Sequence, residues 1–485
     1  MRPLEALFLV VAFVALVASW PFKKPRPQVA LGLCAGALLL AVVQALVEKN
    51  RWQLYPAHLV VLLFGISAFV AWRRQPNEIH SEKRRRWPKI VAVILGMSGV
   101  GVSVAVAVLL PVFAFDPPTG RHAVGMTSYE WVDNDRTDEH PKTPSGHRRL
   151  EVQVWYPAAA SDAAPAAYFD QRHAEGFARG MQMPPFLMNH LPLVRTNGRR
   201  DLPLASGGER FPVVVFSHGY PLPASTATFA AEELASHGYV VFSISHTYDT
   251  AFVLFQDGTS AYAEMTGDIK RLDKAESFLG PRISIWVADA RFVLNEITKL
   301  EATDVRFRGR LDLDRIGYLG LSFGGATAYA ALAADARFKA AVNMDGAYFG
   351  IAVQARPTQP YMLMNGDFAG SDKQIEQAGA TRKEVEAFIE KVQANWAAST
   401  AAGQGARYRV KFAGVSHLGF SDLALMIPAA GANGMPVSKA HRLINQYTLA
   451  FFDQYLKGQS SPLLNGPAPD SAVTLTAAPA PPKTQ

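Results

Sequence analysis

The residue of this chain best placed to do chemistry is Ser322, which lies within Gly320–Gly325 (GLSFGG). A strand-like run, Arg315–Leu319, precedes this stretch, and a helix-like run, Ala326–Ala334, follows it. Gly-x-Ser-x-Gly between a strand and a helix is the pattern of a nucleophile elbow, whose small residues let strand and helix pass closely. The helix N-terminus favours the negative charge that forms on oxygen during acyl transfer. The pattern predicts a nucleophilic serine, and the alternative is a tight turn with an ordinary hydrogen-bonded serine.

A nucleophilic serine needs a histidine as base and an acid that orients the imidazole. On a sheet of this kind the expected chain order is serine, acid, histidine, and only His417 and His441 lie downstream of the serine. His417 follows a strand-like run directly, whereas His441 lies within a helical, partly charged run. We therefore predict that His417 is the base. Asp345 and Asp367 each follow a strand-like run, and chain order alone does not choose between them as the acid.

Acyl transfer also needs two backbone N–H groups to hold the developing oxyanion. The amide of Phe323, directly after the nucleophile, is expected to supply one. The second is expected from the turn after the apolar run Pro212–Ser217, at Gly219 or Tyr220. His218 lies in the same turn, and we interpret it as a residue that braces the loop rather than as a second base.

An apolar loop is a candidate surface for the acyl chain of a substrate. Residues Met181–Met188 (MQMPPFLM) are unusually apolar for a loop, and flexible methionine side chains suit a pliable surface. We predict that Met183, Phe186 and Leu187 contact substrate. The alternative is that the segment packs into the core.

The elements that must position these residues alternate between strand and helix. Continuous apolar runs are typical of strands that are covered on both faces, and helical runs fall between them. This alternation predicts an α/β fold with a mainly parallel sheet, in which active groups lie beyond the carboxyl ends of the strands. The predicted strands are Val124–Val132, Leu150–Tyr156, Pro212–Ser217, Tyr239–Ser245, Arg315–Leu319, Lys339–Met344, Pro360–Asn365 and Tyr408–Phe412.

Four apolar stretches at the N-terminal end are long enough to cross a bilayer core of about 30 Å as helices. They are Leu4–Trp20, Val29–Val47, Leu54–Trp72 and Ile90–Phe115. The first and third loops between them hold 10 Lys and Arg residues, against 3 on the opposite side. By the positive-inside rule these two loops are cytoplasmic, so both ends of the region and everything after it are expected to be extracytoplasmic, in the periplasm or outside the cell.

Composition sets the remaining limits. The formal net charge is +7, but residues 1–116 hold 13 Lys and Arg against 5 Asp and Glu, which leaves 35 against 36 for the rest. The near-neutral larger part argues against nucleic-acid binding. The single cysteine, Cys34, excludes internal disulfides and cysteine-based metal sites. We expect three parts: a transmembrane region (1–116), a catalytic domain (117–457) and a disordered Pro- and Ala-rich tail (458–485).

Five motifs, taken in order, resemble the plasma and intracellular type II platelet-activating-factor acetylhydrolases. The similarity covers most of residues 117–457. The motifs are FSHGY (216–220), ELASHGYVV (233–241), GLSFGGATA (320–328), NMDGAY (343–348) and GVSHLGFSD (414–422).

The resemblance implies an α/β-hydrolase fold and hydrolysis of short or oxidised acyl chains on phospholipids, without metal or other cofactor. It maps the family's acid to Asp345 and the second oxyanion donor to Tyr220, where the residue type differs. Two features depart from the family's pattern. The N-terminal region is not part of it, and the segment Phe368–Ala406 looks longer, with an added helix.

The leading expectation is a membrane-anchored serine ester hydrolase of the 1-alkyl-2-acetylglycerophosphocholine esterase type, with an ester lipid as substrate. One alternative uses the same three residues on general or polyester-type carboxylic esters, or as an acyl-peptide hydrolase. The alternative from another class is a non-catalytic, membrane-tethered binding or sensor module.

Overall fold

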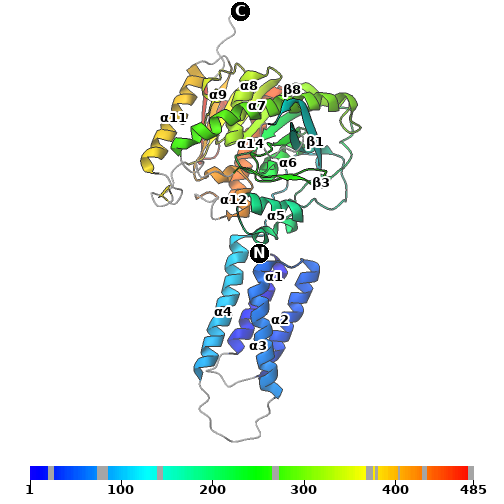
Figure 1. Ribbon diagram of the computed structural model, residues 1–485, viewed down its shortest axis with the longest axis vertical. Coiled ribbons are helices and arrows are strands. Elements are labelled where there is room, and N and C mark those ends of the chain that lie inside the picture. Colours follow the sequence, from blue (N-terminus) through cyan, green and yellow to red (C-terminus); the bar gives the residue numbers. More distant parts are fainter. Residues whose placement is uncertain are drawn as a thin grey trace, which may run out of the picture. The chain divides into compact units, whose positions relative to one another are not determined.

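The computed structural model divides the chain into two compact units, one of helices and one built on a sheet (Figure 1). The first unit comprises Met1–Phe113 and Phe186–Val194, and the second comprises Ala114–Pro185 and Arg195–Gln485. The structure describes residues 1–19, 27–73, 86–138, 146–264, 272–367, 375–376, 381–401, 405–428 and 434–478.

The first unit is made of the helices α1 (Pro3–Ala18), α2 (Pro27–Val47), α3 (Tyr55–Arg73) and α4 (Arg86–Leu109). Three segments of the described chain are long and apolar enough to cross a membrane: Pro27–Val47, Trp52–Arg73 and Trp87–Leu109. The prediction of four spans is therefore wrong in number. With 16 residues, α1 rises only about 24 Å at 1.5 Å per residue, which is short of a hydrocarbon core of about 30 Å.

The fourth apolar stretch also ends earlier than predicted. Helix α4 stops at Leu109 rather than at Phe115, and Pro111 explains this, because proline disfavours a helical residue before it and cannot donate a helical hydrogen bond. On the described helices large apolar side chains point outward, among them Leu39, Leu63 and Leu95, each more than half exposed. Such a surface suits an apolar surrounding.

The second unit is organised around a ten-stranded sheet in the order β12-β11-β10-β9-β8-β4-β5-β2-β1-β3. Six neighbouring strands, from β11 to β5, run parallel, whereas β2 and β1 at one side and β12 at the other pair antiparallel. The strands are β1 (Ala123–Thr137), β2 (His147–Ala158), β3 (Arg199–Arg200), β4 (Phe211–Ser217), β5 (Val240–Ser245), β8 (Leu311–Leu321), β9 (Phe338–Met344), β10 (Tyr361–Asn365), β11 (Arg407–Phe412) and β12 (Val473–Ala478).

Helices cover both faces of this sheet. Helices α7 and α8 lie side by side and share a core with Val213 and Tyr318 (Figure 1). On the other face α14 packs against α6 and against β8, where a Cβ atom at Gly317 would lie 2.7 Å from the ring of Phe452. The helices are α5 (Gln171–Gly180), α6 (Thr228–Ser236), α7 (Leu272–Thr303), α8 (Phe323–Ala334), α9 (Ile351–Gln354), α11 (Arg382–Ala401), α12 (Leu423–Met426), α14 (Val437–Leu456) and α15 (Pro462–Asn465). A small hairpin, β6 (Val253–Leu254) with β7 (Ser260–Ala261), lies apart from the sheet order.

The predicted α/β class with a mainly parallel sheet is confirmed, and each predicted strand corresponds to an observed one.

The prediction of a disordered C-terminal tail, in contrast, is wrong for the described residues up to 478. Helix α15 buries Leu464, and β12 pairs along the whole of β11. A short Pro- and Ala-rich segment that could not form a core of its own is ordered here because the sheet offers it an open edge of backbone donors and acceptors. Part of the longer segment Phe368–Ala406 is α11, and the rest falls largely outside the described residues.

Candidate active site

Ser322 is the single residue between β8 and α8, as the elbow pattern predicts. Its φ of 53° and ψ of −115° lie in a sparsely populated region, which is held because its N–H donates to Met344 O at 2.8 Å. The flanking glycines are required by space. A Cβ atom at Gly320 would lie 2.0 Å from the carbonyl oxygen of Gly324, and one at Gly324 would lie 2.1 Å from that of Ser217.

The structure brings His417 to Ser322. The imidazole Nε2 lies 3.0 Å from Ser322 Oγ, although the two residues are 95 positions apart in the chain. His417 starts a short 3₁₀ turn, His417–Phe420, in the loop that follows β11, and the Ser416 side chain accepts from Gly419 N at the start of that turn. The His417 side chain is 46% exposed, so the nucleophile and its partner are open to an incoming ester.

Asp345 lies on the other side of the same imidazole. Its Oδ2 is 2.6 Å from His417 Nδ1, and its Oδ1 accepts from Gly366 N at 3.0 Å. The carboxylate is almost fully buried. Burial lowers the pKa of His417, but the hydrogen bond and the charge of Asp345 outweigh burial and raise that pKa above its ordinary value. The pair is thus arranged to stabilise an imidazolium.

The competing residues have other partners. Asp367 accepts from Gly414 N at 2.5 Å and ties the end of β10 to the loop that leads toward His417. His441 is buried in α14, stacks on Phe229 with ring centroids 3.8 Å apart, and has its Nε2 3.3 Å from Ser421 O. Burial lowers the pKa of His441 to about 4. The geometry therefore favours Asp345 and His417 over both alternatives.

The predicted oxyanion donors lie in the two turns that meet at Ser322. The turn after β4 approaches closely, since a Cβ atom at Gly219 would lie 3.2 Å from Ser322 Cβ. The carbonyl of His218 accepts from Gly324 N at 3.1 Å and holds this turn against the elbow. Within the described chain, the amides of Phe323 and Tyr220 donate to no other protein group. Both N–H groups are therefore free to bind an oxygen of a substrate.

The apolar loop falls into two parts. Met183 belongs to the second unit and is half-buried, whereas Phe186 and Leu187 belong to the first unit. The ring of Phe186 meets that of Trp52 edge-on, with centroids 5.1 Å apart. The role of these three side chains toward substrate stays a prediction.

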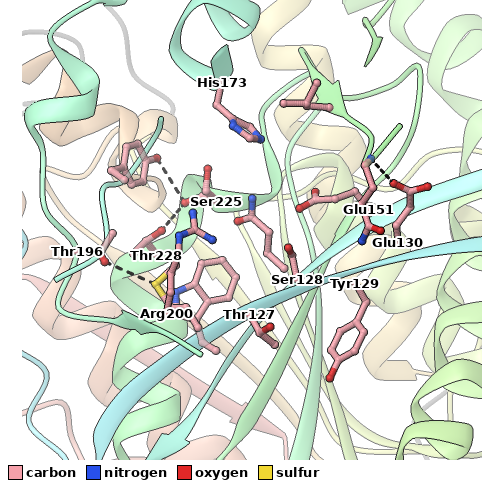
Figure 2. A pocket seen from close by; sticks show the side chains of 16 residues that line it. Thr127, Ser128, Tyr129, Glu130, Glu151, His173, Thr196, Arg200, Ser225 and Thr228 are labelled. Atoms are coloured by element: carbon pink, nitrogen blue, oxygen red, sulfur yellow. Dashed lines mark hydrogen bonds between the residues drawn. The ribbon is translucent and has the colours of Figure 1, made fainter. Parts of the chain in front are cut away.

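A polar cavity that the sequence did not indicate lies between β1, β2 and α5 (Figure 2). Its volume is about 110 Å³, and its wall includes Glu151 and Trp155 of β2, His173 of α5 and Ser225. The Trp155 Nε1 and Ser225 Oγ atoms are buried there without a hydrogen-bond partner in the described chain. Ser322, Asp345 and His417 are not part of its wall. In the described residues no cluster of His, Cys, Asp or Glu could hold a metal ion.

Comparison with known proteins finds a matching family model and similar proteins. The family model described as platelet-activating factor acetylhydrolase, isoform II, matches residues 114–279 and 289–460. A platelet-activating factor acetylhydrolase of Cavia porcellus is 25% identical over 336 residues, which are 63% of this chain and 72% of that protein. A protein of Arthroderma benhamiae named "Probable 1-alkyl-2-acetylglycerophosphocholine esterase" is 29% identical over 161 residues, 31% of this chain and 36% of that one.

Among solved structures, a ferulic acid esterase from Streptomyces cinnamoneus is similar, with a TM-score of 0.59 and 27% sequence identity. The match covers 76% of this chain and 100% of the esterase. Together with the strand order, this likeness confirms the predicted α/β-hydrolase fold.

Proposed function

We propose that this chain, which belongs to the platelet-activating factor acetylhydrolase, isoform II family, is a membrane-anchored serine esterase that releases short acyl chains from phospholipids. Family membership and the likeness to a solved esterase support carboxylic ester hydrolysis. The observation that carries the assignment to residues is the continuous hydrogen-bonded chain from Ser322 through His417 to Asp345, at 3.0 and 2.6 Å.

In the first half-reaction Ser322 Oγ attacks the ester carbonyl carbon, and His417 Nε2 takes the hydroxyl proton. The carbonyl electron pair moves onto oxygen, where the N–H groups of Phe323 and Tyr220 bind it. As the tetrahedral intermediate collapses, the C–O bond to the lysolipid breaks, and His417 returns its proton to that leaving oxygen. Asp345 keeps the other imidazole proton on Nδ1 and stabilises the positive charge throughout.

In the second half-reaction water attacks the acyl group on Ser322. His417 takes a proton from the water, the oxyanion forms again at the same two amides, and the bond to Ser322 Oγ breaks. His417 then gives the proton back to the serine oxygen. The short carboxylic acid leaves, and the free enzyme is restored.

The preference for a short acyl chain is drawn from the relatives. The Cavia porcellus protein is named for platelet-activating factor, and the Arthroderma benhamiae protein for 1-alkyl-2-acetylglycerophosphocholine. An acetyl ester at the second glycerol carbon is therefore the substrate we propose.

The membrane placement is supported by the three apolar segments and by loop charge. The basic residues in the sequence before α2 and those after α3 are expected on the same side, because two spans, α2 and α3, separate them whether or not α1 crosses. By the positive-inside rule that side is cytoplasmic, and the chain that follows α4 is extracytoplasmic. Anchoring beside a bilayer would raise the local concentration of a lipid substrate.

The test uses the purified full chain in detergent and compares phosphatidylcholines that carry acetyl or palmitoyl at the second position. We expect faster release of acetate, and a loss of about 10⁴-fold or more in Ser322→Ala. Equal hydrolysis by the native chain and by Ser322→Ala would refute the proposal. No hydrolysis of any ester by the native chain would favour the non-catalytic sensor.

One observation favours a second candidate, a general carboxylesterase. A solved structure that this chain covers completely is named a ferulic acid esterase, and its name points to an ester of an aromatic acid rather than to a phospholipid. The same purified chain should then prefer a methyl ester of an aromatic acid, or a polyester oligomer, to the acetyl phospholipid. A kcat/KM higher for either of these esters would decide for this candidate.

A further inference from the structure

The second unit contains another Ser–His–Asp array besides the one at the elbow. Ser217 ends β4, His246 follows β5 directly, and Asp289 lies in α7. Ser217 Oγ is 2.8 Å from His246 Nε2, and His246 Nδ1 is 2.8 Å from Asp289 Oδ2. All three residues are 0% exposed, so this serine cannot meet a substrate.

The charges around the array fix the direction of its hydrogen bonds. Asp289 accepts from Arg148 at 2.7 and 3.0 Å and from Arg136 at 2.8 Å. Burial opposes ionisation of Asp289, but Arg148 and the other donors outweigh burial and hold the pKa of this carboxyl well below its usual range. An ionised Asp289 can only accept, so His246 carries a proton on Nδ1. In the neutral imidazole Nε2 is then the acceptor.

The hydroxyl of Ser217 must then donate to His246. Its single hydrogen is used in that bond, so the hydroxyl of Tyr318, 2.7 Å away, donates to Ser217 Oγ. Burial lowers the pKa of His246 and keeps the imidazole neutral, which preserves this order. The indole of Trp286 stacks on the imidazole with ring centroids 3.8 Å apart and fixes its plane.

The array is connected to the turn that supplies an oxyanion donor. Ser217 immediately precedes His218, and the backbone N–H of His246 donates to His218 Nε2 at 3.3 Å. His218 therefore carries its own proton on Nδ1 and donates it to the carbonyl oxygen of Gly219 at 2.9 Å. The side-chain hydrogen bonds of Ser217 and His218 thus hold the start of the turn that follows β4.

The carbonyl of Gly219 determines where the amide of Tyr220 points. The two groups belong to one planar trans peptide unit, in which C=O and N–H point in opposite directions. The same carbonyl also accepts from Leu222 N at 2.6 Å, so it has two donors on one side. Because these two donors hold the Gly219 oxygen in place, the Tyr220 N–H points to the opposite side of the peptide unit.

We propose that Ser217, His246 and Asp289 are positioning residues for the oxyanion hole, which they hold in place through His218 and the Gly219–Tyr220 peptide. The inference rests on the proposed function, because an oxyanion forms only if Ser322 attacks an ester. A device of this kind acts where charge develops, so it affects kcat more than KM.

The decisive variant is Ser217→Ala, and Ser243→Ala is its matched control. Ser243 is equally buried, lies opposite Phe216 on the adjacent strand, and donates to Ala224 O at 2.8 Å, outside the array. The full chain is assayed on 4-nitrophenyl acetate and on the thionoester in which sulfur replaces the carbonyl oxygen. Sulfur accepts weakly from N–H, so the ratio of the two rates reports the oxyanion hole itself.

We expect Ser217→Ala to lower kcat on the oxygen ester roughly 10- to 100-fold. This loss is at most as large as the one caused by removing an oxyanion-hole donor, and KM should stay within about twofold. The ratio of oxygen-ester to thionoester rates should fall by a similar factor, whereas Ser243→Ala should change neither quantity. His218→Ala should reproduce the loss. His218→Asn, whose amide can donate to Gly219 O in place of Nδ1, should recover part of it.

A Ser217→Ala enzyme with the same kcat and rate ratio as Ser243→Ala would overturn the inference. An equal fall of the oxygen-ester and thionoester rates would also overturn it. Such a result means only that a smaller fraction of the enzyme is folded, which leaves the ratio of the two rates unchanged. Absence of hydrolysis by the native chain would instead refute the proposed function, and the two failures are thereby distinguished.

Discussion

Replacement of Asp345 by asparagine should trap His417 in the wrong tautomer. Gly366 N donates to Asp345 Oδ1 at 3.0 Å, so the amide oxygen of an asparagine would take that position. Its NH₂ group would then face His417 Nδ1, where Asp345 Oδ2 now lies at 2.6 Å. A donor at that place forces Nδ1 to accept, and the imidazole proton moves to Nε2. In this form Nε2 cannot take the proton of Ser322.

The expected loss in kcat for Asp345→Asn is about 10⁴-fold, the size found when a buried triad carboxylate is replaced and the tautomer is inverted. At 1.36 kcal/mol per factor of ten this corresponds to about 5.5 kcal/mol of transition-state stabilisation. The volume of the side chain is preserved, so the fold should be retained and KM should change little.

The assay is steady-state hydrolysis of 4-nitrophenyl acetate by the full chain, with circular dichroism to verify folding. Asp367→Asn is the matched comparison, since it makes the same change at the competing carboxylate. Because Asp367 contacts Gly414 N rather than His417, its kcat should fall less than about tenfold. If Asp367→Asn lost more activity than Asp345→Asn, the assignment of the acid would be wrong.

Three further results are expected. In a pH–rate profile, hydrolysis should rise with pH, with a midpoint above the pKa of an ordinary histidine. The reason is that the neutral form of His417 is the base and that the pKa of His417 is raised. A midpoint below the pKa of an ordinary histidine would contradict this. Gly320→Ala should lower the free energy of unfolding in urea by about 1–3 kcal/mol, because its Cβ would overlap the carbonyl of Gly324; unchanged stability would exclude the steric account of the elbow. Asp289→Asn should cost about 3–5 kcal/mol in the same measurement, because it leaves the buried charge of Arg148 without its main partner, and a loss below 1 kcal/mol would argue against that pairing.

What could be predicted from the sequence is what depends on neighbours in the chain. The run Pro212–Ser217 is apolar throughout because its strand is covered on both faces, and β4 matches it closely. Ser322 could be placed on its turn because the elbow needs glycine at fixed positions. His417 followed from chain order and from its loop after a strand, and the structure brings it to the serine.

The acid could not be chosen from residues alone, because its partner depends on how two loops turn. Asp345 has a φ of 57° and reaches the imidazole, while Asp367 is taken up by a backbone amide. Pairing of β12 with β11 and the array of Ser217 with its buried partners are equally non-local. Their members lie far apart in the chain, so no local pattern signals them.

The assignment of Ser322 as the nucleophile and His417 as its base is best tested by covalent labelling of the purified full chain with a fluorophosphonate, followed by peptide mass spectrometry. We expect one modified residue, Ser322, and a labelling rate about 10²- to 10⁴-fold lower in His417→Ala, because the imidazole no longer takes the hydroxyl proton. Modification of a different serine, or an unchanged labelling rate in His417→Ala, would refute the assignment of these two residues.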